Sequence, residues 1–356
     1  MPQRTNSDRN ILNTTQKPVF DVNDHHVNDN HVNDNHVNDN HVYQTDIAII
    51  GAGAIGSLLY CQLAAIKQPL LLTRSRSVGA TSHDDCSTIT LETLNGDSLH
   101  QPCIQANINQ LNKAALANIK LVIVCVKAYQ VTDAIASILA LIPQSCHILL
   151  LHNGMGPHLE VLALLKQHPQ LKLGLSLGTT SQAALKLAPM QVRHTGKGKS
   201  IIGHLSDPVM PLAIQNQLLA AVEDMSVVDD IVTSLWQKLL VNCAINPLTA
   251  LAQCANGELA QPQFQQQIEA ITQECIMVAK ADGVNLSLLD SVAIINQVIK
   301  LTANNFSSMH QDIHHNRKTE ILQINGYVVA RAAHHGLTAA MNQSMLTEIT
   351  ALESAL

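Results

Sequence analysis

The segment DIAIIGAGAIGSLLYCQLAAI, residues 46–66, decides the fold of this 356-residue chain. The residues before the first glycine indicate a short buried strand, and the apolar residues after the last glycine indicate a helix. The turn between them has the pattern G-x-G-x-x-G, which is specific only when it joins a strand to a helix, as it does here. The segment therefore predicts a Rossmann-type α/β domain that binds a dinucleotide. The loop consists of Gly51, Ala52, Gly53, Ala54, Ile55 and Gly56.

Each glycine of this loop has its own physical reason. Gly51 allows the tight turn, Gly53 lets the backbone approach a pyrophosphate, and Gly56 lets the helix pack closely on the strand. The helix N-terminus adds N–H groups and partial positive charge, which favour phosphate binding. The loop is therefore predicted to hold the phosphates of the cofactor.

The second expected strand, Leu70–Thr73, ends where NAD-binding domains usually carry an acidic residue that holds the ribose. This chain has Arg74 there, and Arg76 follows closely. A guanidinium binds a 2′-phosphate that a carboxylate would repel. The sequence therefore predicts NADP (NADPH) as the cofactor. The alternative is that Arg74 is an ordinary surface arginine.

Two further strands are expected at residues 121–126 and 148–151, and polar residues follow both. Lys127 comes after the first strand, and the sequence HNGMG, which contains Asn153, comes after the second. Ligands of open α/β sheets bind at the carboxyl ends of the strands, so we expect both side chains near the cofactor or the substrate. HNGMG could also be a simple turn. A few extra strands, near residues 191–204, are expected to end the domain.

From about residue 231 the apolar pattern becomes helical, which predicts an all-helical second domain. Lys238, Asn242 and Asn246 recur every four residues and lie on one stripe of the expected helix. Asparagine is a poor helix former, and a lysine with two amides at this spacing could hold a carboxylate and hydroxyl groups. Pro247 is expected to kink or end this helix.

A second polar pattern follows at residues 305–320. Asn305, Ser308 and Asp312 fall on one side of an expected helix, and Glu320 would lie near the same side if the helix continued. The sequence N-G-Y at residues 325–327 indicates an interruption or close packing before a final helix.

Residues 1–43 differ from the rest of the chain. The unit HVNDN repeats there with a histidine in register every five residues, a period that matches neither a strand nor a helix. We expect a disordered low-complexity tail. Its imidazoles could bind metal adventitiously, but no catalytic metal is predicted anywhere in the chain. The histidines in register are His26, His31, His36 and His41.

The composition excludes several classes of function. A net charge of −6 gives no basic field for nucleic acid, and the 2% of aromatic residues leaves little for base stacking. No apolar run approaches the roughly 20 residues of a membrane helix, and the polar N-terminus has no signal-peptide core. The eight scattered cysteines form no CxxC pair. We expect a cytoplasmic protein with a dinucleotide-binding domain at residues 44–229 and a helical domain at residues 230–356.

Five blocks of the sequence together resemble the ketopantoate reductase (2-dehydropantoate 2-reductase) family. They occur in the family's order, and the resemblance covers residues 46 to about 346 but not the tail. It implies a Rossmann domain joined to a helical domain like the C-terminal domain of 6-phosphogluconate dehydrogenase. The blocks are HNGMG (152–156), LWQKLLVNCAINPLTA (235–250), CANGEL (254–259), NFSSMHQDI (305–313) and TEILQING (319–326).

The resemblance implies NADPH-dependent reduction of ketopantoate to pantoate, on the route to pantothenate and coenzyme A, by a monomer or homodimer. It implies that Lys238 is the general acid. The implied substrate contacts are Asn153, Lys238, Asn242, Asn246, Asn256, Asn305 and Ser308. Beyond the glycine-rich loop, the implied cofactor contacts are Arg74, Lys127, Asn153, Ala184 and Glu320. The segment GTTSQAALKLAPM (178–190) departs from the family, which leaves the alignment of Ala184 open. The choice between Arg74 and Arg76 also stays open.

Other functions remain open at this point. A reductase with the same two domains could act on a different 2-oxo acid. A dinucleotide-binding redox sensor without turnover would share the loop, but the presence of Lys238 in its motif argues against it. The His-rich tail could add metal or protein binding to an enzyme.

Overall fold

The computed structural model describes residues 41–74 and 86–355. The expected tail, except for its last three residues, and Arg76 lie outside the described residues. Within the described ranges, no helix is long and apolar enough to span a bilayer.

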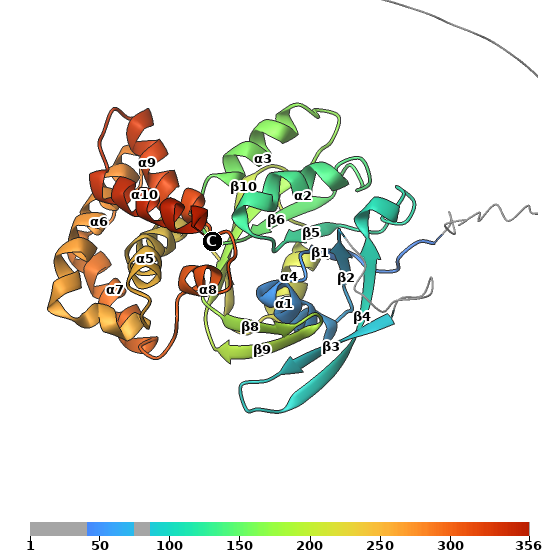
Figure 1. The fold of residues 1–356 in the computed structure, drawn as a ribbon. Coiled ribbons are helices and arrows are strands. Elements are labelled where there is room, and N and C mark those ends of the chain that lie inside the picture. Colours follow the sequence, from blue (N-terminus) through green and yellow to red (C-terminus); the bar gives the residue numbers. More distant parts are fainter. Residues whose placement is uncertain (1–40, 75–85, 356) are drawn as a thin grey trace, which may run out of the picture. The chain divides into compact units, whose positions relative to one another are not determined.

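One sheet forms the N-terminal domain, and its central strands are parallel (Figure 1). These strands lie in the order β7-β6-β5-β1-β2-β4. Ile49 of β1 pairs with Leu71 on one side and Ile123 on the other. Because β2 and β5 flank β1 on opposite sides, the carboxyl ends of β1 and β5 form the switch point where open sheets bind ligands. The central strands are β1 (Ile47–Ile50), β2 (Leu70–Thr73), β4 (Ser98–Asn107), β5 (Leu121–Val124), β6 (His147–Leu151) and β7 (Gly174–Thr180).

The remaining strands extend both edges of the sheet. An antiparallel hairpin of β8 (Ala183–Ala188) and β9 (Gln191–Gly196) joins β3 (Cys86–Glu92) at one edge. β10 (Ser200–Ser206) and β11 (Met225–Val227) extend the other edge beyond β7. The extra strands expected at the end of this domain are therefore present, but they are divided between the two edges.

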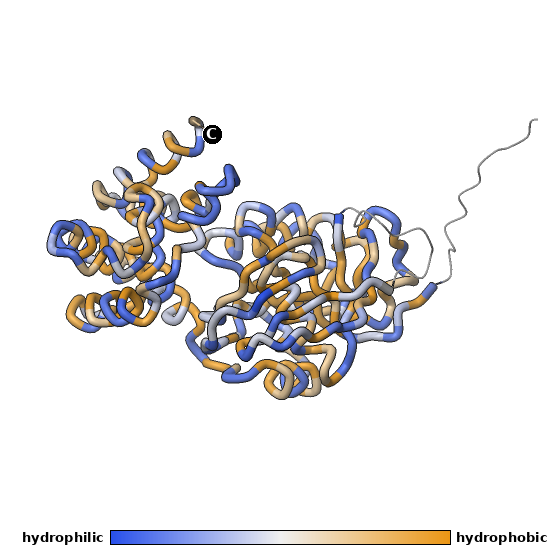
Figure 2. Tube along the Cα trace, turned by 60° about the horizontal axis from the view of Figure 1, so that its bottom comes forward, coloured by the Kyte–Doolittle hydropathy of each residue, from blue (hydrophilic) through white to orange (hydrophobic). Residues whose placement is uncertain are grey.

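Helices cover both faces of the sheet. α1 (Ala54–Ala64) and α4 (Leu212–Ala221) contribute to a hydrophobic cluster on one face. α2 (Val131–Ile138) and α3 (Pro157–Lys166) contribute to the cluster on the other face. Successive strand residues alternate between the two clusters, as pleating requires. Figure 2 shows hydrophobic stretches through the strands and alternating character along the helices. Two short 3-10 turns, η1 (Ile108–Gln110) and η2 (Ala128–Gln130), connect these elements.

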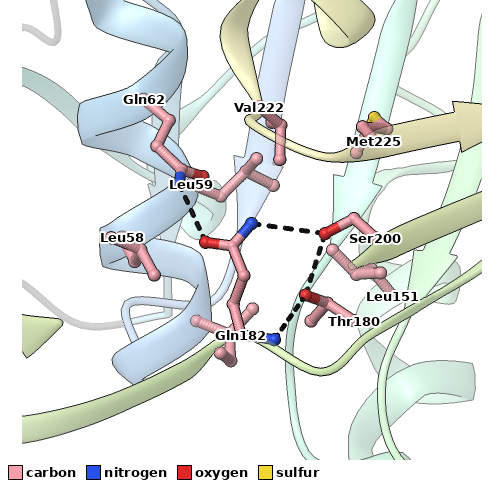
Figure 3. A pocket seen from close by; sticks show the side chains of 10 residues that line it. Leu58, Leu59, Gln62, Leu151, Thr180, Gln182, Ser200, Val222 and Met225 are labelled. Atoms are coloured by element: carbon pink, nitrogen blue, oxygen red, sulfur yellow. Dashed lines mark hydrogen bonds between the residues drawn. The ribbon is translucent and has the colours of Figure 1, made fainter. Parts of the chain in front are cut away.

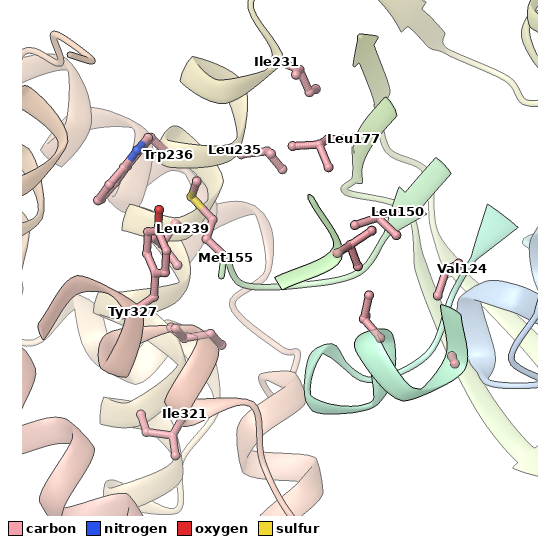
Figure 4. Packing of buried hydrophobic residues seen from close by; sticks show 14 of the residues in the cluster. Val124, Leu150, Met155, Leu177, Ile231, Leu235, Trp236, Leu239, Ile321 and Tyr327 are labelled. Carbon is pink, nitrogen blue, oxygen red and sulfur yellow. The ribbon is translucent and has the colours of Figure 1, made fainter. Parts of the chain in front are cut away.

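Every described regular element after β11 is helical, so the predicted α/β domain followed by a helical domain is confirmed. Figure 4 shows Trp236 and Tyr327 of the helices beside Met155 from the loop after β6, and the Trp236 and Tyr327 ring centroids are 5.7 Å apart. One buried cluster therefore runs from the sheet into the helices. These elements are α5 (Ile231–Ala252), η3 (Asn256–Ala260), α6 (Pro262–Ala281), α7 (Leu288–Leu301), α8 (Ser308–His314), η4 (Ile321–Gln323), α9 (Asn325–His334) and α10 (Ala340–Ser354).

The long helix α5 does not end at Pro247, contrary to one expectation from the sequence, but continues to Ala252. Proline has no N–H to donate to the carbonyl four residues earlier, at Cys243. The fully buried side chain of Asn325 supplies the missing donor, with Nδ2 3.2 Å from the Cys243 carbonyl oxygen. An amide from α9 thus replaces the backbone bond that the proline removes.

The helix expected to carry Asn305, Ser308 and Asp312 begins later than predicted and does not continue to Glu320. α8 begins at Ser308, so Asn305 lies before it, and the Ser307 hydroxyl caps its first turn by accepting from the His310 N–H at 3.1 Å. The helix ends at His314, so Glu320 does not lie on its continuation. The capping residue is therefore Ser307, a residue type that favours this position, and Ser308 is the first residue of the helix.

Candidate active site

The glycine-rich loop is shaped by backbone packing at two of its three glycines. Gly51 has a φ of +113°, and a Cβ there would lie 2.7 Å from the Cys125 carbonyl oxygen. A Cβ on Gly56 would lie 2.0 Å from the Gly51 carbonyl oxygen. At Gly53 the nearest such atom is 3.9 Å away. Gly51 and Gly56 are therefore required by backbone packing, against the end of β5 and within the loop respectively, whereas Gly53 leaves open space where the sequence predicts a pyrophosphate.

The N-terminus of α1 is available to an anion. Gly53 is its N-cap, no side chain caps it, and the Ser57 N–H makes the first intrahelical bond with the Gly53 carbonyl oxygen at 2.9 Å. The preceding N–H groups of the first turn have no acceptor within the helix. Free N–H groups and an open approach at Gly53 fit the phosphates of a dinucleotide.

Arg74 lies at the carboxyl edge of the sheet beside this loop. It is exposed, it follows β2 directly, and its Nη2 lies 3.5 Å from the Gln130 carbonyl oxygen. Gln130 ends the η2 turn that follows β5. The guanidinium is therefore close to the switch point between β1 and β5 and can reach a phosphate there.

Ala184 lies in β8, half-buried and next to α1. Lys186 of the same strand donates from Nζ to the Ala52 carbonyl oxygen at 2.8 Å. The hairpin thus contacts the glycine-rich loop. The only sequence signal for Lys186 is a charge within an apolar stretch.

Lys127 is held by two carboxylates of the helical domain. Its Nζ lies 2.5 Å from Asp312 Oδ2 and 3.6 Å from Glu320 Oε2. The other oxygen of Glu320, Oε1, accepts from the Ala128 N–H at 2.9 Å. Burial lowers the pKa of Lys127, but Glu320 and Asp312 outweigh burial and raise the pKa above its ordinary value. The ammonium therefore stays charged and joins the two domains.

Lys238 lies on α5 at the carboxyl edge of the sheet. Its Nζ donates to the carbonyl oxygen of Thr180, the last residue of β7, at 2.7 Å. Burial lowers the pKa of Lys238 to about 8, and Glu320 acts in the opposite direction. An ammonium with this pKa stays largely protonated near neutral pH and can give up a proton readily.

Asn242 and Asn246 follow Lys238 on the same helix. Asn246 is buried and Asn242 is half-buried. Neither side-chain amide makes a hydrogen bond with another residue in the part of the chain that the structure describes. Both amides can therefore exchange hydrogen bonds with a ligand, which makes these two residues candidates for substrate binding.

The other predicted substrate contacts lie around the start of α8. The Asn256 N–H donates to the Asn305 carbonyl oxygen at 2.9 Å, which brings these two residues together. Asn256 Nδ2 also donates to Thr302 Oγ1 at 2.9 Å, while Asn256 Oδ1 is buried with no partner in the described residues. Asn305 and Ser308 are exposed. Asn256 therefore has a structural partner as well as a free oxygen.

The loop that contains Asn153 is docked rather than a free turn. The Met155 N–H donates to the Gln323 carbonyl oxygen at 2.8 Å, and Gly154 has a φ of +75°. A Cβ on Gly154 would lie 2.5 Å from that same carbonyl oxygen. Glycine is thus required for the loop to approach η4, and the contact places Asn153 near Glu320.

The pKa of His152, in the loop after β6, is affected by two charged residues of the helical domain. Burial lowers the pKa of His152, its bond to the Asn153 carbonyl and the Glu320 charge raise it, and Lys238 lowers it further. Lys238 and Glu320 are therefore both close to the loop after β6. In residues 41–74 and 86–355, no group of three histidine, cysteine or acidic side chains is placed to hold a metal ion.

Two functional groups were not in the set predicted from the sequence. Asp312 was recognised only as a polar residue on a helix, yet it makes the shorter ion pair with Lys127. The Thr180 carbonyl that holds Lys238 is a backbone atom. No side-chain pattern can reveal a backbone acceptor, because every residue carries one.

Comparison with known proteins agrees with this arrangement. Residues 47–207 match the family model described as Ketopantoate reductase PanE/ApbA, and residues 230–353 match the model of its C-terminal domain. The 2-dehydropantoate 2-reductase of Vibrio cholerae serotype O1 is 35% identical over 316 residues, which cover 86% of this chain and 98% of that protein. The chain belongs to the ketopantoate reductase family. This is a family of oxidoreductases.

Solved structures show the same fold. A PanE/ApbA family ketopantoate reductase from Ralstonia eutropha JMP134 superposes with a TM-score of 0.76 at 25% identity, covering 87% of this chain and 99% of that one. A ternary structure of D-mandelate dehydrogenase with NADH and anilino(oxo)acetate gives a TM-score of 0.77 at 22% identity, with the same coverage. The second likeness concerns the fold alone.

Proposed function

We propose that this protein is an NADPH-dependent 2-dehydropantoate 2-reductase, which reduces ketopantoate to (R)-pantoate for the synthesis of pantothenate and coenzyme A. The observation that carries the proposal is the position of Lys238. A half-buried ammonium lies at the carboxyl edge of a dinucleotide-type sheet, on the same helical stripe as two amides that have no partner among the described residues. The family membership of the chain supports the same substrate.

The cofactor would lie along the carboxyl ends of β1, β2 and β5. Gly53 and the first turn of α1 would hold the pyrophosphate, and Arg74 would hold the 2′-phosphate because its exposed guanidinium can form a bidentate pair. Lys127, Asn153, Ala184 and Glu320 would line the rest of its path. Bound NADPH supplies the hydride that the keto carbon receives.

Lys238 would act as the general acid. Negative charge develops on the keto oxygen as the carbon is reduced, and an ammonium within hydrogen-bond reach stabilises this charge and donates the proton. An ammonium has three N–H donors, and only one is used by the Thr180 carbonyl. The other two donors have no acceptor among the described residues and remain for the substrate.

The asparagines would hold the substrate. Asn242 and Asn246 would contact the carboxylate and hydroxyl groups, because both amides lack a partner in the described residues. Asn256, Asn305 and Ser308 would approach from η3 and α8. We expect Asn242→Ala and Asn246→Ala to weaken substrate binding by about 1–3 kcal/mol each, if they leave a buried substrate group unpaired.

The test is oxidation of NADPH by the purified protein in the presence of ketopantoate, followed by absorbance. Other 2-oxo acids with smaller or aromatic side chains serve as parallel substrates, because a reductase of a different 2-oxo acid is the main alternative. The proposal fails if ketopantoate gives no turnover, or if another 2-oxo acid has a much higher kcat/KM. NADPH binding without turnover of any 2-oxo acid would instead favour a sensor.

A further inference from the structure

A chain of polar side chains leads from helix α1 to the carbonyl that holds Lys238 (Figure 3). Gln62 Nε2 donates to Gln182 Oε1 at 2.9 Å, and Gln182 Nε2 donates to Ser200 Oγ at 3.3 Å. Ser200 Oγ then donates to Thr180 Oγ1 at 2.9 Å. The last member is the residue whose backbone carbonyl accepts from Lys238.

Thr180 is the last residue of β7, before the turn that leads to β8. Its Oγ1 accepts a second hydrogen bond, from the Gln182 N–H at 3.1 Å, which fixes the turn after β7. The hydroxyl oxygen thus accepts from both Ser200 and Gln182 and uses both of its lone pairs. The two bonds determine how the Thr180 peptide is oriented, and so where its carbonyl points.

The turn is also held from its other side. The Ser181 N–H donates to the Lys199 carbonyl oxygen at 2.9 Å, and Ser181 Oγ accepts from the Lys199 N–H at 2.9 Å. Gly198 packs so closely that a Cβ there would lie 2.2 Å from the Ser181 carbonyl carbon. The segment after β9 therefore leaves the turn little freedom.

Apolar side chains surround the polar chain. Ser200 is 2% exposed, and the small pocket around it is lined on several sides by aliphatic side chains, shown in Figure 3. Hydrogen bonds in such surroundings are stronger than in water, and breaking one leaves its partner unsatisfied. These side chains are Ile55, Leu58, Leu59, Leu151, Val222 and Met225.

We propose that Thr180, Ser200 and Gln182 are positioning residues for the reaction, because they fix the carbonyl that aims the Lys238 ammonium, and Gln62 ties them to the helix of the dinucleotide loop. The inference rests on the proposed role of Lys238. None of the three side chains is assigned contact with substrate or cofactor. Their effect on the reaction is exerted through the direction of one backbone carbonyl.

The experiment compares substitutions in adjacent residues of β7. Thr180→Val keeps the shape but removes the acceptor, and it should lower kcat with ketopantoate about 10- to 100-fold, the range expected for a misplaced catalytic group. Thr180→Ser keeps the hydroxyl and should restore kcat. Thr179→Val is the matched control, because Thr179 Oγ1 is buried with no partner in the described residues, and it should leave kcat unchanged. NADPH affinity, measured by titration, should stay normal in all three variants.

A double-mutant cycle separates positioning from general stability. Ser200→Ala, which removes the donor to Thr180, should lower kcat in the unmodified protein. In a Lys238→Ala background the same change should have no further effect, since the group being positioned is gone. Single-turnover measurements at high enzyme concentration give the low rates of that background.

The outcomes distinguish failure of the positioning role of Thr180 from failure of the proposed role of Lys238. Thr180→Val with full kcat, or equal losses in Thr180→Val and Thr179→Val, overturns the positioning role. So does a Ser200→Ala decrease that persists without Lys238. If Thr180→Val does not fold, the Ser200→Ala cycle decides alone. If Lys238→Ala itself keeps full kcat, the proposed mechanism fails first, whatever the Thr180 variants do.

Discussion

The glycine-rich loop and the polar stripe of α5 carry function in different ways. In the loop, Gly51 and Gly56 are required because any side chain would collide with neighbouring backbone. On α5, Lys238 and Asn242 are only half-buried, and the amide of Asn242 has no partner among the described residues. Local backbone geometry thus explains the first region, whereas only a bound molecule would explain the second.

This difference predicts two kinds of variant. A substitution that disturbs the loop's own packing should affect folding before it affects chemistry. A substitution on the α5 stripe should leave the fold intact and affect the reaction. Gly53 belongs to the loop, but a Cβ there would meet open space. A substitution at Gly53 should therefore leave the fold intact and affect ligand binding.

The largest effect is expected for Lys238→Ala. Loss of a general acid lowers kcat by about 10²–10⁴-fold, while NADPH binding and thermal stability should stay near normal. KM for ketopantoate could also rise, because the ammonium would contact the ground-state substrate. The exposed neighbour Gln237 provides a control on the same helix, and Gln237→Ala should have full activity. A Lys238→Ala protein with nearly full kcat would contradict the assignment of the acid.

The second prediction concerns two glycines of the same loop. Gly56→Ala should lower the melting temperature strongly or prevent folding, because its Cβ would overlap the Gly51 carbonyl oxygen. Gly53→Ala should fold with a nearly normal melting temperature but bind NADPH about tenfold more weakly, a change of about 1.4 kcal/mol. Thermal unfolding and NADPH titration measure the two quantities. Equal behaviour of the two variants would show that the contrast between packing and ligand space is wrong.

The same contrast explains what the sequence could predict. The glycine loop and strand Leu70–Thr73 are predicted with correct positions, because strand, turn and helix are adjacent in the chain and form one recognisable pattern. The helix through Pro247 was not, because the donor that rescues it comes from Asn325, far away in the sequence. Periodicity within one segment carries no information about such a partner.

The candidate site shows the same limit. The sequence could group Lys238, Asn242 and Asn246, because one helix fixes their spacing. It could not place Glu320 beside Lys127, because their ion pair joins two domains and α8 ends at His314, before Glu320. The roles of these residues stay predictions until the variants are measured.

The third prediction tests the cofactor at the edge of the loop region. Arg74→Asp should weaken NADPH binding roughly 10- to 100-fold, about the energy of a hydrogen-bonded charge pair. NADH binding should change much less, because NADH has no 2′-phosphate. Arg74→Lys keeps the charge but loses the bidentate fork, so its NADPH affinity should lie between that of the unmodified protein and that of Arg74→Asp. Equal use of NADPH and NADH by the unmodified protein would rule out a specific 2′-phosphate site.

The fourth prediction concerns the Cys243 carbonyl of α5, which receives its hydrogen bond from Asn325 because Pro247 has no N–H. Asn325→Ala should lower the free energy of unfolding by about 1–3 kcal/mol, because it leaves the Cys243 carbonyl buried without a donor. Pro247→Ala supplies the missing N–H, so in that background Asn325→Ala should cost less. Urea denaturation of the four proteins gives the coupling energy. Additive costs would mean that Asn325 acts through its bond to Asn342 and not through this carbonyl.

The smallest effect near neutral pH is expected in the pH profile of kcat/KM. This profile also distinguishes the glycine-rich loop from the polar stripe of α5. The active form of Lys238 is the protonated one, and burial lowers its pKa to about 8. The protonated fraction therefore falls as the pH rises through that value, and kcat/KM at pH 8 should be about half of its plateau. The charge of Glu320 raises the pKa of Lys238, so Glu320→Gln should move this basic limb to lower pH. Gly53→Ala should lower NADPH affinity without moving the limb, because the glycine-rich loop carries no titrating group. A limb that moves in Gly53→Ala but not in Glu320→Gln would mean that the titration belongs to cofactor binding and not to the lysine on α5.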